Sequence, residues 1–140
     1  MTRLLKRGQI STEYLIIVGF ITFLVISLSS VAFFYTASSR DRIKFSNLAQ
    51  FANALIVGAE DVYYEGEPSQ RVLTVYLPVG VQSVNIAQEG IYINVTTASG
   101  YNFIFYSSKV PLAGSISHSE GVKRIVIVAQ PDRAHISEDT

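Results

Sequence analysis

The first forty residues contain a long stretch without charge. No residue from Tyr14 to Ser39 is charged, and the segment 14–35 is almost entirely apolar. At 1.5 Å per residue, about 22 helical residues span about 33 Å, which matches the ~30 Å hydrocarbon core of a bilayer. The pattern predicts a membrane-spanning helix over 14–35.

A helical pattern continues beyond that stretch. Apolar residues recur at steps of three and four between Ile43 and Tyr64, while polar residues mostly occupy the other faces. The apolar stripe comprises Leu48, Phe51, Ala52, Leu55, Ile56, Ala59, Val62 and Tyr63. We therefore expect one helix over 9–64, with a membrane-spanning first half and an amphipathic second half.

The hydrophobic period changes from 3.6 to 2 after residues 65–69, where Gly66 and Pro68 end the helix. Alternating apolar residues predict strands over 71–77, 81–87, 91–96, 101–107, 112–117 and 122–129. In the third of these, Ile91, Ile93 and Val95 are expected to face the core. Short strands at this spacing favour an antiparallel sandwich or a small barrel.

The sequence thus predicts an α+β fold in which a long N-terminal helix packs against a small antiparallel β-sheet head. We expect the head to cover 65–130 and the polar residues 131–140 to form a flexible tail. A head of this size is small for a self-sufficient core. We therefore expect its sheet to gain stability from the amphipathic half of the helix.

Composition narrows the classes of function. Lys and Arg total 11 and Asp and Glu total 11, so the formal net charge is zero and no basic patch for nucleic acid stands out. The chain has no cysteine, which excludes disulfides and thiolate metal sites within it. Neither His118 nor His135 has a nearby acidic or histidine cluster with ligand spacing. Nucleophile elbows and phosphate-binding glycine loops are also missing. We expect no enzymatic activity, no cofactor and no metal.

Charges at the two ends of the apolar stretch predict its orientation. Arg3, Lys6 and Arg7 precede it, whereas Arg40 and Asp41 begin a flank of mixed sign. Positive residues prefer the cytoplasmic side of a membrane. We expect a single-pass protein with its N-terminus in the cytoplasm and the residues beyond 40 outside.

One acidic residue stands at the lip of the apolar stretch. Glu13 directly precedes it, and a carboxylate at a helix centre in hydrocarbon costs about 2.5–3.5 kcal/mol on insertion scales. Ionisable groups in such places tend to be functional. The alternative is an acid that only interacts with the positive end of its own helix.

The residues around Glu13 form a recognisable motif. A basic leader ends in Lys6, Arg7 and Gly8, and it is followed by Gln9-Ile10-Ser11-Thr12-Glu13-Tyr14-Leu15. This arrangement resembles the class III signal peptide of archaeal type IV pilins, in which a basic leader ends in Gly before Gln-x-Ser-x-Glu-Tyr-Leu. The close match covers roughly the first 35 residues, at which point the apolar stretch ends.

The resemblance implies that residues 1–8 are a leader removed by a membrane prepilin peptidase, which recognises Lys6 and Arg7 and cuts between Gly8 and Gln9. It further implies that Gln9, Ser11, Glu13, Tyr14 and Leu15 take part in assembly, with Glu13 pairing with the new amine of a neighbouring subunit. The implied partners are identical or related pilin subunits, an assembly platform protein and its ATPase. The implied location is the cell membrane and then an extracellular surface filament used for adhesion.

Three alternatives remain open at this point. An ordinary signal peptidase site is available near Ser30-Val31-Ala32 or Ala37-Ser38-Ser39. A second alternative is a membrane-anchored β-domain that never polymerises and acts as a receptor or accessory protein. A third option is a minor pilin that primes or caps a filament built from another subunit.

The head carries one modification motif. Asn94-Val95-Thr96 is an N-x-T sequon, and Asn94 is expected to face outward from its strand together with Tyr92 and Thr96. Asn94 is therefore a candidate glycan acceptor.

Overall fold

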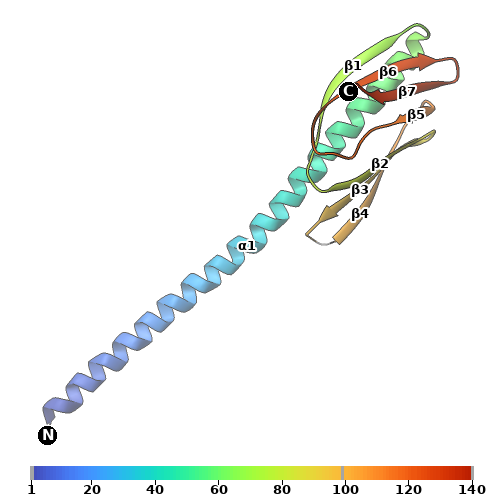
Figure 1. Ribbon diagram of the computed structural model, residues 1–140. Coiled ribbons are helices and arrows are strands. Elements are labelled where there is room, and N and C mark those ends of the chain that lie inside the picture. The colour runs from blue at the N-terminus through green and yellow to red at the C-terminus, as the bar shows by residue number, and fades with distance from the viewer. Residues whose placement is uncertain (1, 99, 140) are drawn as a thin grey trace. The chain divides into compact units, whose positions relative to one another are not determined.

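A computed structural model describes the backbone of residues 2–98 and 100–139 and the side chains of residues 11–36, 39–98 and 100–139. The chain divides into two compact units, Met1–Ser39 and Arg40–Thr140. Its elements are α1 (Thr2–Glu65), β1 (Gln70–Leu77), β2 (Val81–Ala87), β3 (Gly90–Thr97), β4 (Gly100–Ser107), β5 (Leu112–Ser115), β6 (Gly121–Gln130) and β7 (Arg133–Glu138). The predicted α+β fold, a long helix with a β-rich head, is confirmed (Figure 1).

The helix α1 is longer at its start than predicted. Its backbone is helical from Thr2 rather than from residue 9, and it ends at Glu65. The end has a clear cause, because Gly66 adopts a positive φ of 78° and its N–H donates to the carbonyl of Val62 at 3.1 Å. This is the left-handed glycine cap that commonly ends helices.

The second unit contains two sheets. One is four-stranded with the order β1-β6-β7-β5, and the other is three-stranded with the order β2-β3-β4. Neighbouring strands are antiparallel except for β5 and β7, which run parallel. The prediction of a wholly antiparallel head is therefore wrong at this one pair.

The apolar stripe of the helix supplies about a third of the buried apolar residues of the core. Leu48, Phe51 and Leu55 are buried along α1, and they pack in one cluster with strand residues such as Ile125 and Ile127. The four-stranded sheet lies alongside this part of the helix in Figure 1. The predicted amphipathic half of the helix is thus confirmed as the surface on which the head folds.

The helix approaches the four-stranded sheet closely at Gly58. A Cβ built on Gly58 meets Cδ1 of Leu73 at 2.8 Å and Cδ1 of Ile127 at 3.1 Å. Hydrogen bonds anchor the other sheet, since Asp41 Oδ2 accepts from the backbone N–H of Ala98 at 3.2 Å. Both sheets are therefore attached to the same helical segment.

The C-terminal residues differ from the prediction. Instead of a flexible tail over 131–140, Arg133–Glu138 forms β7, which lies between β6 and β5 in the sheet. Ala134 and Ile136 are fully buried. Two apolar residues at a spacing of two are enough for a strand here, because pairing on both sides satisfies the backbone polar groups.

Candidate functional site

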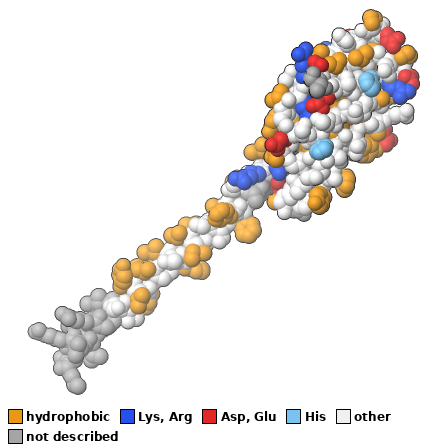
Figure 2. Space-filling model, in the orientation of Figure 1, with side chains coloured by type: hydrophobic (Ala, Val, Ile, Leu, Met, Phe, Trp, Pro, Cys, Tyr) orange, Lys and Arg blue, Asp and Glu red, His pale blue; other side chains and the backbone are white. Residues whose placement is uncertain are grey.

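The most unusual surface belongs to the first unit. Between Tyr14 and Tyr35, the large apolar side chains of α1 are all at least 40% exposed. They occupy successive positions along the segment and therefore surround the helix. Orange side chains mark the face of the segment that Figure 2 shows. A helix that is apolar all round belongs in an apolar environment.

The few polar side chains on this surface are satisfied within the helix. The hydroxyl of Ser27 donates to the carbonyl of Phe23 at 2.8 Å, and the same bond to the residue four positions earlier recurs along the segment. The other hydroxyls that make it are those of Thr22, Ser29, Ser30 and Thr36. Because lipid offers no hydrogen-bond partners, internal pairing of this kind lowers the cost of inserting the segment.

These features together define a membrane-competent helix. Among the residues whose side chains are described, one helical segment is long and apolar enough to cross a membrane. It is the part of α1 from Ser11 to Glu65, whose most apolar 18 residues have a mean hydropathy of 2.5. This property is compatible with the predicted membrane anchor.

The predicted processing and assembly residues lie at the start of this surface. The side chains of Ser11, Glu13, Tyr14 and Leu15 are exposed on the helix. Those of Lys6, Arg7, Gly8 and Gln9 lie outside the described residues. Glu13 thus occupies an exposed helical position, one residue before the uncharged surface begins.

The head carries a second apolar surface, on the outer face of the three-stranded sheet. Phe103 and Tyr101 on β4 are 81% and 74% exposed, and Phe105 and Tyr92 are also exposed. The rings of Tyr92 and Phe105 lie 4.6 Å apart between centroids. The alternation of aromatic residues in 101–107 is visible in the sequence, but an alternating strand does not reveal which of its faces is covered.

Asn94 lies on this same outer face, as predicted. Its side chain lines a groove of about 260 Å³ that is formed by Ser83, Asn85, Tyr92, Ile93, Asn94 and Phe103. Asn94 is half-buried rather than fully outward, and its Oδ1 is buried without a hydrogen-bond partner. Ile91, Ile93 and Val95 are buried on the opposite face, so the predicted alternation of β3 is confirmed.

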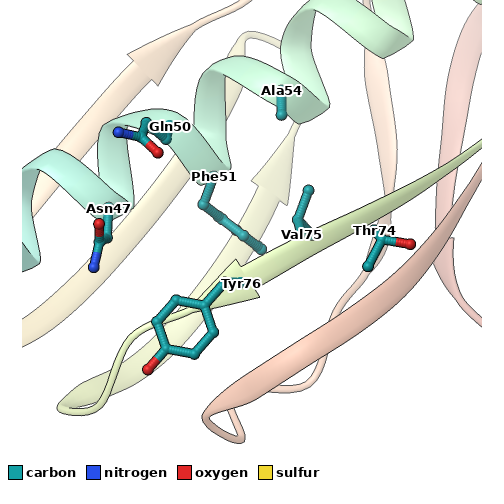
Figure 3. A pocket seen from close by; sticks show the side chains of 7 residues that line it. All are labelled: Asn47, Gln50, Phe51, Ala54, Thr74, Val75 and Tyr76. Carbon is teal, nitrogen blue, oxygen red and sulfur yellow. The ribbon is translucent and has the colours of Figure 1, made fainter.

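A second groove, of about 220 Å³, lies between the helix and β1 (Figure 3). Its helical wall contains Asn47, Gln50, Phe51 and Ala54, and its strand wall contains Thr74, Val75 and Tyr76. Amides and hydroxyls at the rim are neutral hydrogen-bonding groups. The groove therefore offers polar contacts but no acid, base or nucleophile pair of the kind that catalysis requires.

One cluster around a buried lysine has a structural role in the head. Lys123 is buried on β6, and its Nζ donates to Glu138 Oε1 at 2.8 Å, to Ser119 Oγ at 3.0 Å and to Ser117 Oγ. The hydrogen bonds from Lys123 and Ser117 lower the pKa of Glu138 to about 2. All three ammonium protons have acceptors and the charge is balanced, so this cluster is an internal clamp rather than a Ser–Lys catalytic pair.

The two histidines occupy different settings. His118 is exposed in the loop after β5, whereas His135 lies in β7 rather than in the tail where the sequence placed it. Within the described part of the chain, no group of three or more His, Cys, Asp or Glu side chains is placed to hold a metal ion.

Comparison with known proteins identifies no relative, since no family model, curated protein or solved structure matches the chain.

Proposed function

We propose that this chain is a pilin-like subunit of an archaeal type IV pilus-like surface filament. The observation that carries the proposal is the uncharged surface of α1 between Tyr14 and Tyr35, which is exposed on all sides. Such a surface requires lipid before assembly and the same segments of neighbouring copies afterwards. Both environments are apolar, so one helix serves both states.

The energy of burial supports a helical bundle. Covering several hundred Å² of apolar surface per subunit stabilises the assembly by on the order of 10 kcal/mol before the entropy of association is subtracted. The internally bonded hydroxyls of Thr22 and Ser27 remain compatible with this packing, because they need no partner from outside the helix. No enzymatic activity, metal or cofactor is part of this function.

Processing in this proposal follows the motif at the start of the chain. A membrane prepilin peptidase recognises Lys6 and Arg7 and cuts between Gly8 and Gln9. The subunit then lies in the cell membrane with its N-terminus in the cytoplasm and its head outside. An assembly platform protein and an ATPase draw it into an extracellular filament, which serves adhesion.

Glu13 has a specific role in this assembly. Cleavage gives Gln9 an α-amine that is cationic near neutral pH. The carboxylate of Glu13 pairs with the amine of a neighbouring copy, and at 4 Å and an effective dielectric constant of 20 the attraction is about 4 kcal/mol before desolvation. Because desolvation cancels much of this attraction, the pairing mainly sets the register between subunits.

The competing function is a membrane-anchored β-domain that does not polymerise. The same exposed helix fits that function as long as it stays in lipid. The test is electron microscopy of cells that express the epitope-tagged chain together with a prepilin peptidase and an assembly system. Tagged surface filaments support the proposal, and a tag confined to the membrane without filaments supports the anchored domain. Filaments that carry the tag only rarely indicate a minor pilin.

A further inference from the structure

The strand β4 is an unprotected sheet edge. Within the described residues it pairs with β3 alone, and its eight residues include no proline and no charged side chain. Edge strands of monomeric proteins are normally protected by charges, prolines or bulges, because their free backbone groups pair with strands of other chains. The edge of β4 has none of these features and therefore fits a further strand.

The free backbone groups of β4 can be identified from its register. The N–H of Ser108 donates to the carbonyl of Glu89 at 2.9 Å, and hydrogen-bonded pairs alternate along an antiparallel ladder. The backbone groups of Tyr101, Phe103 and Phe105 therefore point away from β3. These are also the residues whose aromatic side chains are exposed. The open edge and the aromatic row thus belong to the same three residues.

The strand β1 forms a second open edge, whose one charged residue, Arg71, pairs with Asp61 on α1. It pairs with β6 alone among the described strands, and the N–H of Ala129 donates to the carbonyl of Ser69 at 2.9 Å. By the same alternation, the backbone groups of Val72, Thr74 and Tyr76 point away from β6. Their side chains are exposed and uncharged.

The two edges lie at opposite ends of the head. The four-stranded sheet runs from β1 to β5, and β5 lies against β2, from which the other sheet runs to β4. The path from one open edge to the other therefore crosses the whole head (Figure 1). A copy that uses one edge for one neighbour leaves the other edge free for the next.

We infer that β4 of one copy pairs with β1 of the next copy, so that the heads join edge to edge. The contact is heterologous, and contacts of this type build open helical arrays when the rotation between copies does not close. It matches an aromatic row with a row of Val72, Thr74 and Tyr76, and no charge faces another charge across the pair. The inference rests on the proposed filament, which presents copies to one another in a single orientation.

The absence of cysteine makes this contact directly measurable. Thr74 and Phe103 lie at the centres of the two rows, and the backbone groups of both point toward the neighbouring copy. They therefore lie directly opposite each other when the two strands pair antiparallel. Paired residues in a sheet have Cα atoms about 4.5–5.5 Å apart, within the range that a disulfide bridges. We therefore co-express Thr74→Cys and Phe103→Cys as full-length chains with different tags, oxidise the cells and measure mixed-tag dimers. A matched control replaces Phe103→Cys by Val122→Cys, which is exposed but lies on the interior strand β6.

We expect mixed-tag dimers from Thr74→Cys with Phe103→Cys, none from the Val122→Cys control, and ladders from a chain that carries both edge substitutions. Normal filaments without mixed dimers overturn edge pairing and leave the filament intact. Dimers from Phe103→Cys alone overturn it in favour of two-fold pairing of β4 with itself. If the unaltered chain forms no filaments, the proposed function fails, and the cross-linking result in membranes still decides whether the edges pair.

A second variant tests the contact without oxidation. Phe103→Pro removes a backbone N–H that points away from β3, so the head retains its internal ladder. Ile104→Pro is the control, because it removes a hydrogen bond to β3. We expect the first variant to fold, as judged by protease resistance, and to lose the cross-link between Val72→Cys and Phe105→Cys, which lie opposite each other when Thr74 pairs with Phe103. Undiminished cross-linking in this variant contradicts a backbone-paired edge.

Discussion

Gly114 lies directly against the backbone of Ile136. A Cβ built on Gly114 comes within 1.8 Å of the carbonyl oxygen of Ile136, and Gly114 has a φ of 130°, which other residues rarely adopt. This contact joins the parallel strands β5 and β7. The absence of a side chain at Gly114 therefore lets β5 approach β7 closely along this pair.

Gly114→Ala is therefore expected to destabilise the head by about 2–4 kcal/mol, from steric overlap and backbone strain together. The measurement is chemical denaturation of the detergent-solubilised chain, followed by tryptic sensitivity of the head. Ser115→Ala in the same strand is the control, because its exposed side chain predicts a change within about 0.5 kcal/mol. Equal stability of the two variants contradicts the close contact.

The Lys123–Glu138 clamp predicts a dependence of stability on acid. The pKa of Glu138 is lowered from 4.5 to about 2 in the folded chain. The contribution of the Glu138 carboxylate to the free energy of unfolding is therefore complete above pH 4.5 and is lost as the pH falls toward 2. Glu138→Gln should cost on the order of 2 kcal/mol at pH 7 and should flatten the loss of stability between those two values.

The control for the clamp is Glu120→Gln, which changes an exposed carboxylate in the loop before β6. Denaturation curves at several pH values should show the native acid dependence in this control. If Glu138→Gln keeps the same acid dependence as the native chain, the clamp does not stabilise the folded state.

A charge placed on the uncharged helix surface should abolish filaments. Phe23 and Val25 are exposed in the isolated chain, and in a bundle an aspartate at either position would be buried without a partner. Phe23→Asp and Val25→Asp should each leave the head folded, because the head has its own core in the second unit. Filament counts by electron microscopy provide the measurement, and Phe23→Leu is the matched control. Normal filaments with either aspartate would refute a packed helical core.

Removing the charge of Glu13 tests its role between subunits. Glu13→Gln keeps the shape of the side chain, so the variant should be processed and inserted but should assemble poorly. The test compares the processed fraction on gels with the filament yield from the same cells. A normal yield leaves only the local interpretation, in which Glu13 stabilises the start of its own helix.

The elements of the fold that rest on local pattern are predictable from the sequence. The stripe from Leu48 to Val62 specifies the buried helix face, and the strands over 70–107 lie within about one residue of their predicted bounds, which is the usual limit of boundary definition. The strand β7 was missed because only Ala134 and Ile136 are apolar within a polar segment. Its burial depends on pairing with β6 and β5, which is non-local information.

The two candidate surfaces also differ in how far the sequence alone predicts them. The uncharged helix is evident from composition, because no covering element hides it. The open edges at Phe103 and Thr74 depend on strand order, and strand order is set by packing between distant segments rather than by alternation within one strand.

The proposed processing and assembly are tested most directly by the mass of the subunit in filaments sheared from cells that express the chain. We predict that the sheared material contains this chain with Gln9 as its first residue, and that replacing Gly8 by phenylalanine leaves the uncut chain in the membrane fraction. A chain that begins near residues 32–40 in the medium, or one that remains in the membrane while no filament contains it, would contradict processing after Gly8 and assembly into a filament.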